Sequence, residues 1–114
     1  MILKVILEGQ TVPVEVPDYL IQEGEEFFRK MDADMDKGYQ MSRTWVERPD
    51  VVQRCQIAAD RLLTALEQDN TRVGTMMAAY ILARLPGVGG VRLTTGGDML
   101  EHEFFMAGGP EPGF

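Results

Sequence analysis

The chain of 114 residues has little of the chemistry from which most active sites are built. Its only cysteine, Cys55, cannot form a disulfide within the chain. Its only histidine, His102, excludes a site with paired histidine ligands. The longest apolar run, residues 73–83, is shorter than the roughly 20 residues that span a bilayer. Together with the lack of a signal-peptide pattern at residues 1–8, these absences predict a cytoplasmic protein that does not enter the membrane.

Positive charge is also scarce. Lysine and arginine number 11 against 18 aspartates and glutamates, which gives a net charge of −7. The acidic residues dominate 1–36 and 98–114, and the arginines between these segments are interleaved with further acids. Nucleic-acid binding normally requires a dense basic patch. The charge pattern therefore argues against nucleic acid and favours a basic protein partner or a cation.

Both ends of the chain have the alternation typical of strands. Residues 2–7 and 11–16 are rich in β-branched side chains and flank a short loop that contains glycine, which predicts a β-hairpin. Pro13 has no N–H to donate to a neighbouring strand, so we expect that its strand lies at a sheet edge or leaves that position unpaired. Residues 88–95 and 99–106 predict two further strands.

Helical periodicity occupies the middle of the chain. The predicted helices are one that begins at Asp18 as N-cap and ends between Met31 and Gly38, a short one capped by Ser42, and two longer ones at 50–68 and 72–85. We therefore expect one α+β domain over residues 1–106, with a small, mostly antiparallel sheet packed against a central layer of three to four helices. Residues 107–114, rich in glycine and proline, predict a flexible tail.

A cluster of carboxylates is the most distinctive local feature. Asp32, Asp34 and Asp36 alternate near the predicted end of a helix, where the helix dipole disfavours negative charge. One reading is a solvated helix end neutralised by nearby lysines and arginines. The other is a divalent-cation site, because carboxylate oxygens are the ligands that Ca²⁺ and Mg²⁺ prefer.

The segment around these aspartates resembles the first half of an EF-hand calcium loop. Phe28 and Met31 precede Asp32 as in that family, and the three aspartates occupy alternate loop positions. The resemblance implies a Ca²⁺ or Mg²⁺ module with a degenerate loop at 32–47. The family's glycine is displaced by Lys37, and the position of its bidentate glutamate holds Arg43.

Methionine and aromatic residues surround the same segment. They have two readings, as core residues or as an adaptable contact surface rimmed by acids; the residues are Met31, Met35, Tyr39, Met41 and Trp45. Cys55 lies on the apolar stripe of a predicted helix and is expected in the core, and His102 is expected on the surface of a strand.

No convergent catalytic set can be assembled from one histidine, one cysteine and scattered acids. We therefore predict a non-catalytic accessory or interaction domain without a bound cofactor, using the surface of methionines and aromatics. Two alternatives stay open, the divalent-cation module and a small carboxylate-based enzyme subunit. A homo-oligomer is compatible with either.

Overall fold

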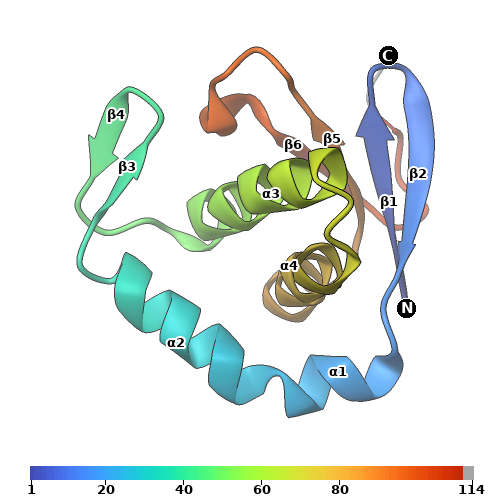
Figure 1. The fold of residues 1–114 in the computed structure, drawn as a ribbon, viewed down its shortest axis with the longest axis horizontal. Coiled ribbons are helices and arrows are strands. Elements are labelled where there is room, and N and C mark those ends of the chain that lie inside the picture. Colours follow the sequence, from blue (N-terminus) through green and yellow to red (C-terminus); the bar gives the residue numbers. More distant parts are fainter. Residues whose placement is uncertain (112–114) are drawn as a thin grey trace.

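The computed structural model describes residues 1–111 and shows a four-stranded sheet packed against helices (Figure 1). The strands are β1 (Ile2–Leu7), β2 (Gln10–Glu15), β5 (Val88–Leu93) and β6 (Glu103–Met106). Their order is β2-β1-β5-β6. β1 pairs with β2 and β5 with β6 in antiparallel fashion, whereas β1 and β5 run parallel. The predicted α+β class is confirmed, and so is the edge position of the strand that contains Pro13.

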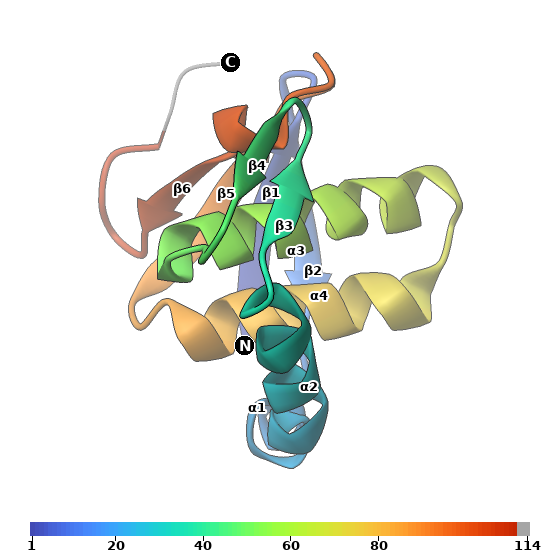
Figure 2. The ribbon, with the colours of Figure 1, turned by 90° about the vertical axis from the view of Figure 1, so that its left-hand side faces the viewer.

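Two helices form the layer against the inner face of the sheet. They are α3 (Val51–Glu67) and α4 (Thr71–Arg84), which lie side by side as an antiparallel pair (Figure 2). A capping box starts α3, because the Asp50 side chain accepts from Gln53 N–H while the Gln53 side chain accepts from Asp50 N–H. Asn70 caps α4 by accepting from Val73 N–H.

The remaining elements form an arm that leads from β2 around the helical pair (Figure 1). They are α1 (Asp18–Glu23), α2 (Glu25–Met35) and the hairpin of β3 (Tyr39–Met41) and β4 (Thr44–Val46). The predicted single helix is split at Gly24, where a Cβ would lie 2.7 Å from both the Leu20 carbonyl and the Phe28 ring. The predicted N-cap is also corrected, because Pro17 holds that position and Asp18 instead pairs with the N-terminal amine.

The short helix predicted after Ser42 is wrong, because residues 39–46 form a β-hairpin. Ser42 has a left-handed backbone, with φ of 56°, which places it in the turn rather than at a helix N-cap. The ring of Trp45 lies directly over Gly38, whose φ is +94°. A side chain at Gly38 would collide with that ring, so the start of the hairpin requires glycine on both counts.

Glycine also allows the two central strands to approach closely. A Cβ at Gly90 in β5 would collide with the Lys4 carbonyl of β1 and with the Phe105 ring of β6. The strand predicted from residue 88 is confirmed, since β5 begins at Val88.

The segment after β6 follows the outside of the sheet. The Ala107 N–H donates to the Gly87 carbonyl at 2.8 Å, and Glu111 lies 3.5 Å from Lys4. Residues 112–114 of the predicted tail lie outside the described residues. A single turn of 3₁₀ helix, η1 (Met99–Glu101), precedes β6 in place of the strand residues expected there. No helix within residues 1–111 has the length and apolarity needed to cross a bilayer.

Candidate functional site

The carboxylate of Asp32 lies at the centre of a network of paired charges, which we call the Asp32 cluster: Glu25, Asp32, Asp36, Arg54, Tyr80 and Arg84. Asp32 accepts from the Tyr80 hydroxyl at 2.5 Å and from Arg84 Nε at 3.0 Å. Arg84 also forms a bidentate pair with Glu25, in which both N···O distances are 2.9 Å. The cluster thus joins α2 to α4 through four side chains, two from each helix.

Arg54 ties α3 to the same cluster. Its Nη2 donates to Asp36 at 2.5 Å, and its Nη1 donates to the Asp32 carbonyl at 3.2 Å. Its Nε donates to the Pro49 carbonyl at 2.8 Å. The cations of the cluster are largely covered, since Arg54 and Arg84 expose only 15% and 19% of their side chains.

The three aspartates do not converge. Asp32 and Asp36 point toward arginines, whereas Asp34 is exposed on α2. No group of three or more histidine, cysteine or acidic side chains within residues 1–111 is placed to hold a metal ion. The resemblance to an EF-hand loop is corrected, because Asp32 and Asp34 lie inside α2 and a β-hairpin follows where that family has a helix. A cation site at these residues stays a prediction, which calorimetric titration with Ca²⁺ and Mg²⁺ beside Asp34→Asn would test.

The network also determines the protonation of its members. The bidentate contact with Glu25 and the bond to Asp32 raise the pKa of Arg84 above its usual value, although burial opposes this. Burial and the bond to Asp32 raise the pKa of Tyr80, so its hydroxyl stays a donor. The contact with Arg84 lowers the pKa of Glu25. These shifts hold Glu25, Tyr80 and Arg84 in the protonation states in which they are already paired.

The side chains of Cys55 and His102 are both buried within the fold. Cys55 is fully buried, as predicted, and burial together with the charge of Asp32 raises the pKa of its thiol to about 12. His102 was expected on the surface but is only 3% exposed. Its Nδ1 accepts from Thr94 N–H at 3.1 Å, which leaves Nε2 to donate to Asp60, also at 3.1 Å. Gln56 fixes the same segment through bonds to the carbonyls of residues 100 and 102.

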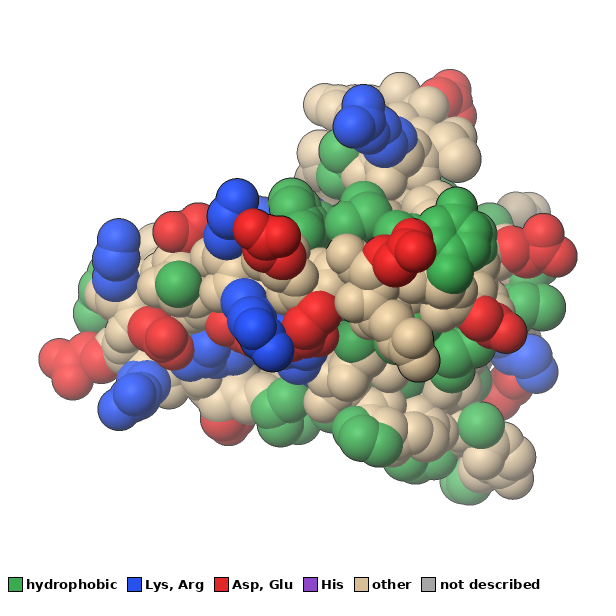
Figure 3. Space-filling view, turned by 90° about the horizontal axis from the view of Figure 1, so that it is seen from below, with side chains coloured by type: hydrophobic (Ala, Val, Ile, Leu, Met, Phe, Trp, Pro, Cys, Tyr) green, Lys and Arg blue, Asp and Glu red, His purple; other side chains and the backbone are tan. Residues whose placement is uncertain are grey.

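The prediction that the methionines and aromatics form an exposed contact surface is largely wrong. Met31, Met35 and Met41 are 6%, 3% and 0% exposed, because they fill the space between the arm and the helical pair. Tyr39 is half-buried against the same core. Trp45 is exposed at 56%, so it is the one member of the set that solvent reaches freely. On the face formed by α1 and α2, acidic and basic side chains are mixed (Figure 3).

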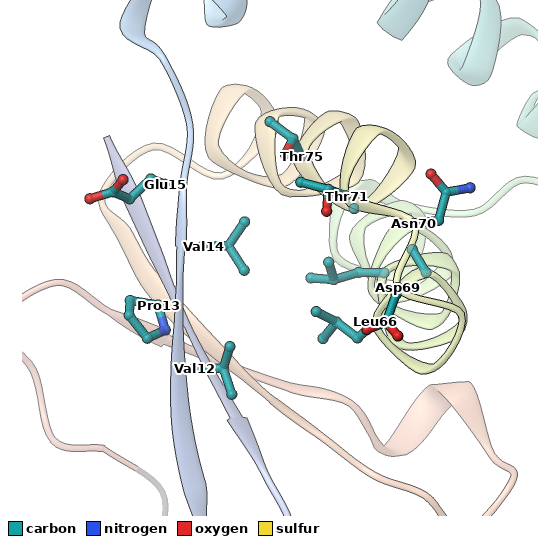
Figure 4. A pocket seen from close by; sticks show the side chains of 12 residues that line it. Val12, Pro13, Val14, Glu15, Leu66, Asp69, Asn70, Thr71 and Thr75 are labelled. Atoms are coloured by element: carbon teal, nitrogen blue, oxygen red, sulfur yellow. The ribbon is translucent and has the colours of Figure 1, made fainter.

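An open groove separates β2 from the turn between α3 and α4, and we call it the β2 groove. Its volume is about 480 Å³. One wall is strand β2, where Val12 and Val14 point toward the helices (Figure 4). The other wall consists of the residues Leu62, Ala65, Leu66, Asp69, Asn70, Thr71, Gly74 and Thr75. Val12 remains 37% exposed, because the helical pair does not extend over the edge strand.

The backbone of β2 offers unpaired groups along this groove. Met1 and Val16 exchange two hydrogen bonds of 2.7 Å and so form a hydrogen-bonded pair. Such pairs alternate along an antiparallel ladder. The register therefore directs the backbone groups of Thr11, Pro13 and Glu15 away from β1. Within residues 1–111 these outward groups have no backbone partner.

Two acids border the groove without forming a pair. Glu15 points from β2 to the side opposite the helices, whereas Asp69 lies at the turn between α3 and α4 (Figure 4). Their carboxylates therefore do not converge as a catalytic pair would. No lysine or arginine is among the described residues that line the groove.

Sequence reasoning missed this groove as a site, although its signals were present. Pro13 marked β2 as an edge strand, and the alternation of Val12 and Val14 marked the face that meets the helices. The missing information was the position of the turn at Asp69, which no local pattern supplies.

Comparison with known protein families, with characterised proteins and with solved structures finds no match to this chain.

Proposed function

We propose that this chain is a non-catalytic protein-interaction domain, and that its partner binds in the β2 groove. The observation that carries the proposal is the open edge strand, where apolar side chains line the groove and unpaired backbone groups lie along its outer edge. Peptide segments bind other domains at grooves of this kind, between a strand and a helix. The charges that border the groove, from Glu15 and Asp69, favour a basic partner.

The polar chemistry elsewhere in the chain supports a role without catalysis. Both ring nitrogens of His102 are engaged, and the pKa of Cys55 is raised to about 12. Every buried side-chain nitrogen and oxygen within residues 1–111 has a hydrogen-bond partner. Polar groups that are satisfied internally stabilise a fold, whereas an active site requires groups that remain available to a substrate.

A pair of matched substitutions tests the proposal. Val12→Lys places a positive charge in the groove, and Val51→Lys makes the same change at the far end of α3. The two valines are 37% and 46% exposed, so both variants should fold. A native partner, first captured from the host and then purified, should bind the parent protein and Val51→Lys. Its affinity for Val12→Lys should fall at least about tenfold.

Circular dichroism of both variants serves as the control for folding. Equal affinities of the purified partner for the two variants would contradict the proposal, because the partner would then bind elsewhere.

A further inference from the structure

The unpaired groups on β2 define how a partner would be held. Thr11 and Glu15 each present an N–H and a C=O to the open edge, and Pro13 presents only a C=O. A strand laid beside β2 can therefore receive two hydrogen bonds and donate three. The two N–H donors, on Thr11 and Glu15, are four residues apart along an extended strand. This spacing matches a partner segment that is also extended, and not a helix.

From this pattern, we infer that the β2 groove binds an extended, basic and apolar segment of another protein, which adds to the sheet as a fifth strand next to β2. The inference rests on the proposed function and specifies its binding mode. Alternate side chains of the segment would enter the groove beside Val12 and Val14 and contact Leu66 on the helical wall. The side chains between them would lie on the outer face, near Glu15.

The charges beside the groove indicate that the bound segment carries positive charge. Glu15 and Asp69 stand on the two sides of the edge, one on the outer face and one at the helical turn. A lysine or arginine on either face of the added strand can therefore meet a carboxylate. An acidic segment would meet like charge on both faces.

Pro13 argues against a second copy of this chain as the occupant. Two β2 strands related by a twofold axis would each bring a residue without an N–H, so their ladder would lose donors on both strands. The glutamates and aspartates that border each groove would also approach one another. A different protein with a full set of amides brings no second proline and no second set of bordering acids, so it avoids the partner's share of both penalties.

The experiment uses peptides selected from a displayed library of random linear sequences on the full chain. We expect the selected peptides to alternate apolar residues with lysine or arginine, and to lose binding as salt is raised. Each peptide is then resynthesised with N-methyl groups on every second amide, in the two possible phases. Strand addition predicts that one phase weakens binding at least about tenfold while the other has little effect, because only alternate amides face β2.

Hydrogen exchange of the protein supplies a second readout. The amides of Thr11 and Glu15 should exchange more slowly in the complex, whereas the amide of Val73, at the capped start of α4, should not change. Thr75→Lys, on the helical wall, should weaken the same peptides as Val12→Lys.

The outcomes separate the two proposals. If peptides require Val12 but both N-methyl phases bind equally, and Thr11 and Glu15 show no protection, strand addition is wrong while the groove remains the binding site. If the selected peptides bind Val12→Lys as well as the parent protein, the proposed function is wrong too. Selection of predominantly acidic peptides, or of the β2 sequence itself, would overturn the inference that a basic segment of another protein binds in the groove.

Discussion

The Asp32 cluster and the β2 groove differ in whether their polar groups are already hydrogen-bonded within the described part of the chain. In the cluster, three acids and a tyrosine meet two arginines, and each buried side-chain nitrogen or oxygen has a hydrogen-bond partner within residues 1–111. In the groove, the backbone groups of Thr11 and Glu15 have no hydrogen-bond partner within residues 1–111. Asp32 and Asp36 are conspicuous in the sequence because they are charged, yet in the structure they are paired with arginines of the same chain. The groove is inconspicuous in the sequence, and it is the place where we propose that a partner binds.

Asp32→Ala should produce the largest loss of stability. It removes the acceptor shared by Arg84 and Tyr80 and leaves a largely covered guanidinium short of a partner. We expect the free energy of unfolding to fall by about 3 kcal/mol, measured by urea denaturation. Asp34→Ala, two residues away on an exposed position, should stay within about 0.5 kcal/mol. Equal losses in the two variants would show that the cluster does not hold the arm.

Tyr80→Phe should have the next largest effect. The change removes only the hydroxyl that donates to Asp32, and the Phe28 and Arg84 contacts with the ring are retained. A hydrogen bond to a charged group contributes roughly 1.5 kcal/mol, so we expect a loss of about that size in the same assay. The matched control is Tyr39→Phe, on the half-buried hairpin, which should change stability by less than about 0.5 kcal/mol. A neutral Tyr80→Phe would mean that the arginines alone satisfy Asp32.

Glu25→Gln should alter the dependence of stability on pH. Contact with Arg84 lowers the pKa of Glu25 in the folded chain below its ordinary value of 4.5. A lowered pKa contributes stability that is present above pH 4.5 and is lost as the pH falls through the folded pKa. The parent protein should therefore lose stability more steeply than Glu25→Gln when acidified below pH 4.5. Glu26→Gln, which also removes one negative charge, controls for net charge and should retain the steeper slope.

Pro13→Val should have the smallest effect on stability and should test the groove side of the comparison. The substitution restores an N–H to the open edge without touching the β1–β2 ladder, because Pro13 lies at a position that does not bond to β1. We expect the free energy of unfolding to change by less than about 1 kcal/mol. Sedimentation should show more self-association than for the parent protein at the same concentration. An unchanged sedimentation profile would mean that proline is not what protects this edge.

The sequence predicted those elements whose causes are local. The helix that became α3 has its capping box in Asp50 and Gln53 and its apolar stripe through Cys55, all within the helix itself. The hairpin of β1 and β2 was equally explicit. Residues 39–46 were mispredicted because their conformation depends on a contact between Trp45 and Gly38, which the spacing of apolar residues does not reveal.

The candidate sites depended on partners far away in the chain. Asp32 meets Arg54 and Arg84, which are 22 and 52 positions distant, so the sequence revealed three acids without the cations that neutralise them. His102 is buried because Asp60 and Thr94 approach it from α3 and the end of β5. The groove was only half visible, since β2 could be recognised as an edge but its helical wall could not.

The pairing of β1 with β5 has a consequence for biosynthesis. Lys4 and Gly90 are neighbours in the sheet, although they lie 86 positions apart in the chain (90 − 4) and Lys4 is synthesised first. The first hairpin must therefore leave the ribosome without the strand that completes its inner edge, and it carries exposed valines and isoleucines while it waits. Folding of the sheet is thus expected to follow synthesis of α4 and β5.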